Sequence, residues 1–334
     1  MRVRPVDPRA VSPAELSAMH AIRTAVLRHD EPDRRRPTRA ELRAELTVPW
    51  PGLRTAYWRC ADPAGQPVGM ASLALPSGAD EHTAYAEIDV LPEHRRLGAG
   101  RHLMGEAFRM AYSSGRDHVL GRAVDSRDGD RAARASQARP VHRETRSVLD
   151  LTAVDTAALP AVPGGYYLLR VRGDTPPELY GDIAAAHRGM ADAPRAESAS
   201  EPEPHDVDRV VAFDRMLAGR DLEQLRVLAC HRASGEPAGI SYVIVPQRSP
   251  ARSEQGDTVV ASTHRGNDLS RVLKAELLRW LRADFPKVAE LTTWVASDNA
   301  SMHAVNRSLG YCDKATYTHW QLPVADVTAD LGMR

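Results

Sequence analysis

The feature that most constrains the fold of this chain is an internal repeat with a constant spacing of 170 positions. The segment CADPAGQPVGMASLALP, residues 60–76, aligns without a gap with CHRASGEPAGISYVIVP, residues 230–246. The same spacing continues through EHRRLGAGRHL (93–103) and its counterpart THRGNDLSRVL (263–273). A constant register over about 45 residues indicates a duplicated domain, because a solenoid needs at least three shorter units.

Length and composition agree with two domains of ordinary size. The chain has 334 residues, of which 43% are hydrophobic and 26% charged, and this length is large for one compact core. The linker-like composition of Thr152–Gly165 predicts an N-terminal domain of residues 1–155 and a C-terminal domain of residues 156–334. The acidic, proline-bearing stretch 195–209 is predicted to be a surface loop or lid of the second domain.

Several classes of protein are disfavoured by the composition. The formal net charge is zero, so nothing steers the whole molecule toward nucleic acid or a membrane surface. The N-terminus lacks the apolar core of a signal peptide, which predicts a cytoplasmic protein. The three cysteines form no CxxC pair, which argues against a disulfide framework and a zinc site. Nearly all basic residues are arginine, which is typical of high-GC genomes such as those of actinobacteria.

Both copies predict the same order of secondary structure, namely strand, turn, strand, a third strand and then a helix. In the third strand of the first copy, Tyr85, Glu87 and Asp89 alternate with apolar residues and so share one face. Further strands are predicted at residues 117–124 and 289–296, and residues 139–151 are expected to close the first domain. The chain is therefore expected to belong to the α/β class, with a mixed α+β sheet in each domain.

The first copy places R-x-x-G-x-G between the third strand and the helix, at residues 95–100. Backbone N–H groups at a helix start are unpaired and favour an anion, and glycine allows its close approach. Three arginines, Arg95, Arg96 and Arg101, add cationic donors of the kind that a diphosphate would contact. The chain lacks both a GxGxxG that opens a βαβ unit and a GK[ST] motif, so the dinucleotide and Walker alternatives fail.

The stretch DVLPEHRRLGAGRHL closely resembles the cofactor loop of the GNAT N-acetyltransferase superfamily. The second copy resembles the late half of a GNAT domain, with Asn299, Met302, Asn306 and the tripeptide 309–311 (LGY) in the expected places. Tandem GNAT proteins, including the mycothiol synthase type, share this organisation. The resemblance implies two tandem GNAT-like domains, each a mostly antiparallel, splayed central sheet flanked by helices.

The resemblance also implies a co-substrate, acetyl-CoA or another acyl-CoA, and no metal. The cofactor would lie where the strand that ends at Val90 diverges from the strand near Val124. The residues implied in cofactor binding are Ile88, Asp89, Val90, Arg95, Arg96, Leu97, Gly98, Ala99, Gly100 and Arg101. Glu87 lies where many members place the general base, and Asp89 is the second candidate. A backbone N–H near Val90 would meet the oxyanion.

The sequence departs from the family where many members place a tyrosine as the general acid. In the second copy that place holds Asn306, which has no proton to give at neutral pH, and in the first copy it holds Arg134 or Ala135. Possible substitutes without positional support are Tyr85, Tyr112 and His142.

The second copy also lacks both glycines of the loop, because Asp268 and Ser270 stand where the first copy has Gly98 and Gly100. A carboxylate at Asp268 would repel a diphosphate, so the first domain is expected to bind the cofactor and the second to be mainly structural. The opposite assignment, with catalysis in the C-terminal domain, stays open because relatives of the mycothiol synthase type favour it.

The expected activity is N-acylation of a small-molecule primary amine by direct attack on the thioester, with acetyl as the expected acyl group. A non-catalytic CoA-binding or structural tandem module is the alternative, and acetylation of protein lysines is a weaker possibility. We expect no nucleic-acid or membrane partner, and the sequence leaves open whether the protein is a monomer or a homodimer.

Overall fold

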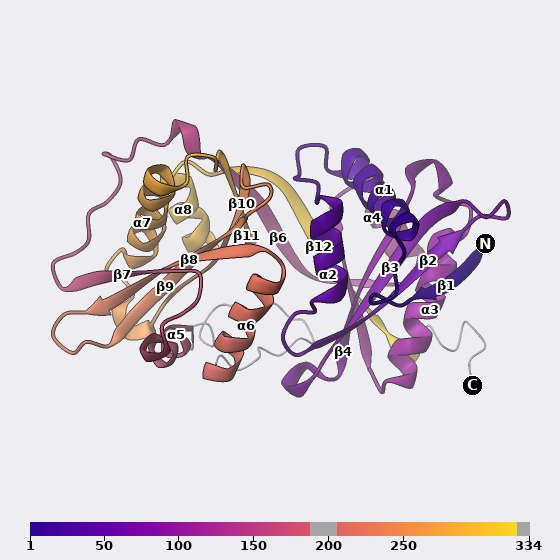
Figure 1. Ribbon diagram of the computed structural model, residues 1–334, viewed down its shortest axis with the longest axis horizontal. Coiled ribbons are helices and arrows are strands. Elements are labelled where there is room, and N and C mark those ends of the chain that lie inside the picture. The colour runs from indigo at the N-terminus through magenta and orange to yellow at the C-terminus, as the bar shows by residue number, and fades with distance from the viewer. Residues whose placement is uncertain (188–205, 326–334) are drawn as a thin grey trace. The chain divides into compact units, whose positions relative to one another are not determined.

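The computed structural model describes residues 1–187 and 206–325, which form two compact units (Figure 1). The first unit consists of Met1–Arg143 and the described residues from Tyr317 onward. The second unit consists of the described residues between Glu144 and Thr316. The loop predicted at residues 195–209 lies, up to residue 205, outside the described residues.

The first unit is a sheet with the strand order β1-β2-β3-β4-β5-β12. Its only parallel pair among the described residues is β4–β5, and the other pairs along this order are antiparallel. The strands are β1 (Arg2–Val6), β2 (Leu53–Ala61), β3 (Pro67–Pro76), β4 (Thr83–Val90), β5 (His118–Val124) and β12 (Cys312–Pro323), and the helices are α1 (Pro13–Asp30), α2 (Arg39–Thr47), α3 (Ala99–Ser113) and α4 (Arg127–Ala135).

Alternating residues of β2 and β3 bury opposite faces of this sheet. Trp58 of β2 and Leu73 of β3 join the core formed with α3. Tyr57 of β2 and Met70 of β3, which lie on the opposite face, join a separate core with α1 and α2. Because side chains alternate across a strand, one strand can pack against helices on both faces.

The second unit repeats this architecture with the strand order β6-β11-β10-β9-β8-β7. The helix α7 covers one face, and α5 and α6 cover the other. The strands are β6 (Arg139–Asp150), β7 (Tyr166–Arg172), β8 (Leu222–His231), β9 (Pro237–Pro246), β10 (Arg252–Val260) and β11 (Glu290–Ala296), and the helices are α5 (Tyr180–His187), α6 (Val207–Gly219), α7 (Leu269–Asp284) and α8 (Ala300–Ser308). The α/β class and the two mostly antiparallel sheets expected from the sequence are confirmed.

Each unit takes one strand from the other half of the chain. Residues 144–150 of β6 pair with β11, and Leu149 and Leu151 pack in the core of the second unit. Residues 317–323 of β12 pair with β5, and Leu322 packs in the core of the first unit. The expectation that residues 139–151 close the first domain is therefore wrong, because their second half completes the other sheet. The predicted boundary between residues 155 and 156 concerns where one copy of the repeat ends and the next begins, and it stays a prediction. The compact units are divided at other positions, between Arg143 and Glu144 and before Tyr317.

A glycine repeated at the spacing of 170 marks a close approach of two strands. A Cβ at Gly69 of β3 would lie 3.0 Å from the Asp89 carbonyl oxygen of β4, and one at Gly239 would lie 2.6 Å from the Val259 carbonyl oxygen. The distance at Gly239 is one that real side chains essentially never show, and at Gly69 a Cβ would force its neighbours to shift by a few tenths of an ångström. The glycines thus let the ends of β4 and β10 lie close to the neighbouring strand, just before the glycine loop and its counterpart.

One core position differs in chemistry between the copies. Lys274 of α7 is buried and stands where α3 has Met104. Its ammonium lies 5.2 Å from the centre of the Tyr311 ring, and the described residues offer it no carboxylate. Burial lowers the pKa of Lys274 from its ordinary value of 10.5 to about 7.

We expect Lys274→Met to stabilise the protein near neutral pH, by an amount that shrinks as the pH rises. The unfolded chain binds a proton at Lys274 below its ordinary pKa of 10.5, whereas the folded chain does so only below about 7. The free energy of unfolding therefore falls as the pH drops from 10.5 to 7, and the variant lacks this loss. Urea denaturation of both proteins at about pH 7 and about pH 10 measures the difference. The exposed Lys287→Met is the control, and an equal gain for Lys274→Met at both pH values contradicts the prediction.

Candidate active site

The parallel strands β4 and β5 are hydrogen-bonded at only one end. Their pairing begins at Thr83 with His118 and stops at Ala86 with Gly121. Residues 87–90 continue along β3 but have no partner on the side of β5. We call residues 87–90 and 122–124 the open end of the β4–β5 ladder. The open end lies at the position where the resemblance to GNAT proteins implies that the cofactor binds.

The glycine loop leads from this open end into α3, and its counterpart in the second unit has the same backbone conformation. Each loop has two residues in the left-handed region, two positions apart. In the first unit these are Arg96 (φ 67°) and Gly98 (φ 93°). In the second unit they are Gly266 (φ 82°) and Asp268 (φ 59°). The second copy has therefore moved its glycine to the other left-handed position, and aspartate tolerates this region better than most residues.

The two loops differ in the charges they present. Arg96 and Arg101 of the first unit are exposed and make no ion pair with the described residues. In the second unit Asp268 pairs with Arg271, the counterpart of Arg101, with Nε–Oδ2 and Nη2–Oδ2 distances of 2.7 and 2.5 Å. This contact neutralises the arginine and leaves a carboxylate at the start of α7. Among the described residues, the first loop thus offers two arginines without an ion pair, Arg96 and Arg101, whereas the second loop offers one, Arg265.

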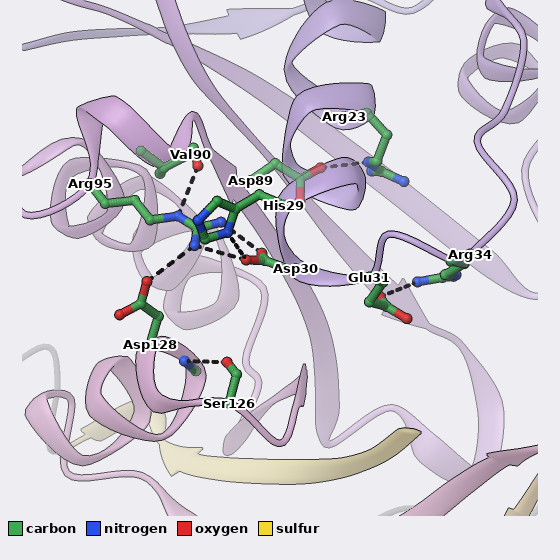
Figure 2. A network of polar contacts seen from close by, with 11 residues as sticks. Arg23, His29, Asp30, Glu31, Arg34, Asp89, Val90, Arg95, Ser126 and Asp128 are labelled. Carbon is green, nitrogen blue, oxygen red and sulfur yellow. Dashed lines mark hydrogen bonds and ion pairs between the residues drawn. The ribbon is translucent and has the colours of Figure 1, made fainter. Parts of the chain in front are cut away.

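Arg95, the first residue of the motif, lies in a network of polar contacts rather than in solvent (Figure 2). Its Nη1 and Nη2 donate to the two carboxylate oxygens of Asp30, at 2.9 and 2.7 Å. Its Nε donates to the Val90 carbonyl oxygen at 3.2 Å, and Nη1 lies 3.3 Å from Asp128 Oδ2. Burial alone would raise the pKa of Asp30, but the hydrogen bonds from Arg95 and His29 outweigh it and lower that pKa.

The two candidate bases on β4 share one partner, Arg23 of α1 (Figure 2 shows its contact with Asp89). The Arg23 Nε–Asp89 Oδ2 distance is 2.5 Å, and the Arg23 Nη2–Glu87 Oε2 distance is 3.4 Å. The Asp89 side chain is 16% exposed, whereas that of Glu87 is 59% exposed. Burial raises the pKa of Asp89, and Arg23 opposes this shift without cancelling it. Glu87 is thus the accessible carboxylate, and Asp89 is a buried member of an ion pair.

The second unit has different chemistry at the corresponding place. Asp257, the counterpart of Glu87, accepts a hydrogen bond from the Tyr242 hydroxyl at 3.2 Å. The Tyr242 ring lies so close to Gly256 that a Cβ there would be 2.0 Å from it. The strand β10 also shifts register against β9 between Gln255 and Thr258, whereas β4 pairs with β3 in a continuous register. An aromatic ring therefore covers β10 where β4 presents an exposed carboxylate.

The places of the general acid hold no tyrosine in either copy. Asn306 is buried inside α8, and Arg134 and Ala135 lie in the last turn of α4. Among the substitutes, the Tyr85 hydroxyl donates to Asp80 at 2.5 Å, Tyr112 is exposed, and the His142 ring lies 5.1 Å from that of His319. None of these contacts brings a substitute to Glu87.

Three residues near the open end were not predicted from the sequence. Arg23 and Asp30 come from α1, and Tyr317 comes from β12, opposite Val124 of β5. The Tyr317 hydroxyl donates to Glu31, the residue that follows α1. No local pattern marks these residues, since each acts through a contact with a distant part of the chain.

Comparisons with known proteins agree with this geometry. Residues 19–135, which contain the open end of the β4–β5 ladder and the glycine loop, match the acetyltransferase (GNAT) family. A tandem GNAT protein from the clavulanic acid biosynthesis pathway has a similar structure, with a TM-score of 0.83 and 27% identity over 97% of this chain and 98% of that one. A GCN5-related N-acetyltransferase from Sphaerobacter thermophilus has a similar structure, with a TM-score of 0.71 and 16% identity over 97% of this chain and 95% of that one. No curated protein matches the sequence significantly.

A splayed strand pair that leads through a glycine loop into a helix defines the GNAT class of acetyltransferases. Residues 19–135 thus carry a GNAT acetyltransferase domain, and the duplicated architecture of the chain is similar to that of a tandem GNAT protein. Members of this family transfer acetyl groups from acetyl-CoA. No described helix is both long and apolar enough to cross a membrane.

Proposed function

We propose that this protein is an acetyl-CoA-dependent N-acetyltransferase that acts on a small-molecule primary amine and binds its cofactor in the N-terminal domain. The observation that carries the proposal is the intact glycine loop beside the open end of the β4–β5 ladder. The similarity of the whole chain to a tandem GNAT protein from the biosynthetic pathway of a small molecule, clavulanic acid, supports a small-molecule substrate.

Backbone groups of the protein would bind the cofactor along its pantetheine and diphosphate parts. Pantetheine would pair with Ile88, Asp89 and Val90, whose edge toward β5 is not occupied by a strand. The diphosphate would bind the N–H groups of residues 96–101 at the start of α3, with Arg96 and Arg101 as exposed cations. Gly98 begins the helix without a side-chain cap, so these N–H groups remain available.

Glu87 is the proposed general base. An ammonium substrate must lose a proton before its nitrogen can attack the thioester carbonyl, and an exposed carboxylate can accept this proton directly or through water. Asp89, the second candidate, is already paired with Arg23 and is less suited to this role. The thiolate of CoA would take its proton from water, since neither copy places a tyrosine for this task.

A second candidate function is CoA binding without turnover, which the missing tyrosine favours. Catalysis in the C-terminal domain has less support, because Asp268 neutralises Arg271 and Tyr242 covers β10.

Calorimetric titration with acetyl-CoA, followed by an assay of amine-dependent thiol release, tests the proposal. We expect one binding site per chain and thiol release that depends on an added small-molecule amine. Binding without release for any of a panel of amines would support the non-catalytic alternative. Two sites per chain would show that the second loop tolerates Asp268, and no binding would contradict both functions.

A further inference from the structure

Four contacts occupy the guanidinium of Arg95, and they differ in strength. Asp30 receives two parallel hydrogen bonds in the bidentate geometry that gives arginine–carboxylate pairs their strength. The bond to the Val90 carbonyl fixes the end of β4. The contact with Asp128 is the longest of the four, at 3.3 Å, and the Asp128 side chain is 52% exposed. Exposed ion pairs contribute little, so Asp128 is the partner that Arg95 can exchange most easily.

The contact with Asp128 connects the two sides of the open end of the β4–β5 ladder (Figure 2). Arg95 follows β4 and binds the Val90 carbonyl, while Asp128 lies in the first turn of α4, which follows β5. Arg95 also opens the glycine loop on which the diphosphate would bind. An anion on this loop would compete with the Asp128 carboxylate for the same N–H group.

In the first unit Arg95 contacts both a carbonyl at the end of its strand and two aspartates, and the described residues of the second unit keep only the first kind of contact. Arg265, the counterpart of Arg95, keeps the contact with its own strand end, with an Nε–Val260 O distance of 3.4 Å. Among the described residues it forms no ion pair with a carboxylate. The carbonyl contact thus belongs to the frame common to both copies, and within residues 1–187 and 206–325 contacts of this arginine with aspartates occur only beside the loop that retains its glycines.

We propose that Asp128 is an internal competitor of the cofactor: it occupies Arg95 when no anion is bound and yields that N–H group to the diphosphate of acetyl-CoA. Asp30 keeps its two bonds throughout and positions Arg95. Cofactor binding would then release the first turn of α4 from Arg95. This inference rests on the proposed function, since it assumes that the diphosphate binds the glycine loop.

The variant Asp128→Asn tests the inference by calorimetric titration of the full-length protein with acetyl-CoA. We expect a dissociation constant roughly three- to tenfold lower than that of the wild type, because both the competitor and a negative charge near the diphosphate are removed. Asp130→Asn is the matched control, because it removes the same charge from the same helical turn but has no contact with Arg95. We expect its effect to be less than about twofold, since a partly exposed charge that makes no direct contact with the loop is screened.

A double-mutant cycle with Arg95→Gln distinguishes competition from a general change of charge. If Asp128 acts through Arg95, the gain in acetyl-CoA affinity from Asp128→Asn falls in the Arg95→Gln background to the less than about twofold effect expected for Asp130→Asn, whereas an undiminished gain in that background overturns the inference. Equal affinities of the wild type and Asp128→Asn, or equal gains from Asp128→Asn and Asp130→Asn, overturn the inference but leave the proposed function intact. A wild type that binds no acetyl-CoA overturns both.

Discussion

Gly98→Asp is expected to weaken acetyl-CoA binding by at least about 100-fold while the protein stays folded. At about 5 Å and an effective dielectric constant near 20, two unit charges of the same sign repel each other by roughly 3 kcal/mol. Each ~1.4 kcal/mol corresponds to a tenfold change in affinity. The fold should tolerate the change, because Asp268 occupies the same left-handed position in the second unit, and the space beside Gly98 is open to 3.7 Å. Calorimetric titration and the thermal unfolding midpoint measure the two effects.

Two further variants separate charge from backbone strain. Gly98→Ala places a neutral residue in the left-handed region, at a cost of roughly 1–2 kcal/mol in stability and without a charge near the diphosphate. It should retain most of the affinity for acetyl-CoA. Asp268→Gly makes the complementary change in the second loop and should leave the number of binding sites at one. A second site in Asp268→Gly would mean that this aspartate alone closes the C-terminal loop, and unchanged binding in Gly98→Asp would remove the first loop from the cofactor site.

Glu87→Gln is expected to lower kcat by about 10²- to 10⁴-fold, the range that general base catalysis supplies, and to change acetyl-CoA affinity little. The amide keeps the size of the side chain but cannot accept a proton from the substrate ammonium. Because the Glu87 side chain is mostly exposed, its replacement should not disturb the core. Steady-state kinetics with a saturating amine, together with calorimetric titration, separates the chemical step from binding.

Asp89→Asn serves as the comparison for Glu87→Gln. It removes the partner of a partly buried arginine, so we expect a loss of stability that Glu87→Gln does not share. If kcat is normal in Glu87→Gln and greatly reduced in a folded Asp89→Asn, the base is Asp89. Normal rates in both variants would remove the β4 carboxylates from the mechanism.

The contrast between the two copies explains why a loop can lose its glycines and keep its frame. The loop needs two left-handed residues to turn β4 or β10 into a helix, and this need is met by Arg96 and Gly98 in one copy and by Gly266 and Asp268 in the other. The geometry therefore depends on the pair of conformations rather than on a glycine at one fixed position. Binding of an anion depends in addition on the charge, and there the copies differ.

The sequence by itself determined the duplication, the order of the elements and the place of the glycine loop. These features are local: alternation along a strand, helical periodicity and the spacing of 170 positions can all be read from neighbouring residues. The face shared by Glu87 and Asp89 follows from the same alternation.

Only the tertiary structure decided which strand completes which sheet and which charged groups surround the loop. Nothing in the sequence near β6 or β12 distinguishes pairing within its own half from pairing with the other half, because both sheets offer an equivalent edge strand. Likewise, Arg95 is a cation beside a glycine loop in the sequence, but 65 positions separate it from Asp30, which holds its guanidinium. Contacts between distant residues depend on how the helices pack on the sheet, and local patterns do not encode that packing.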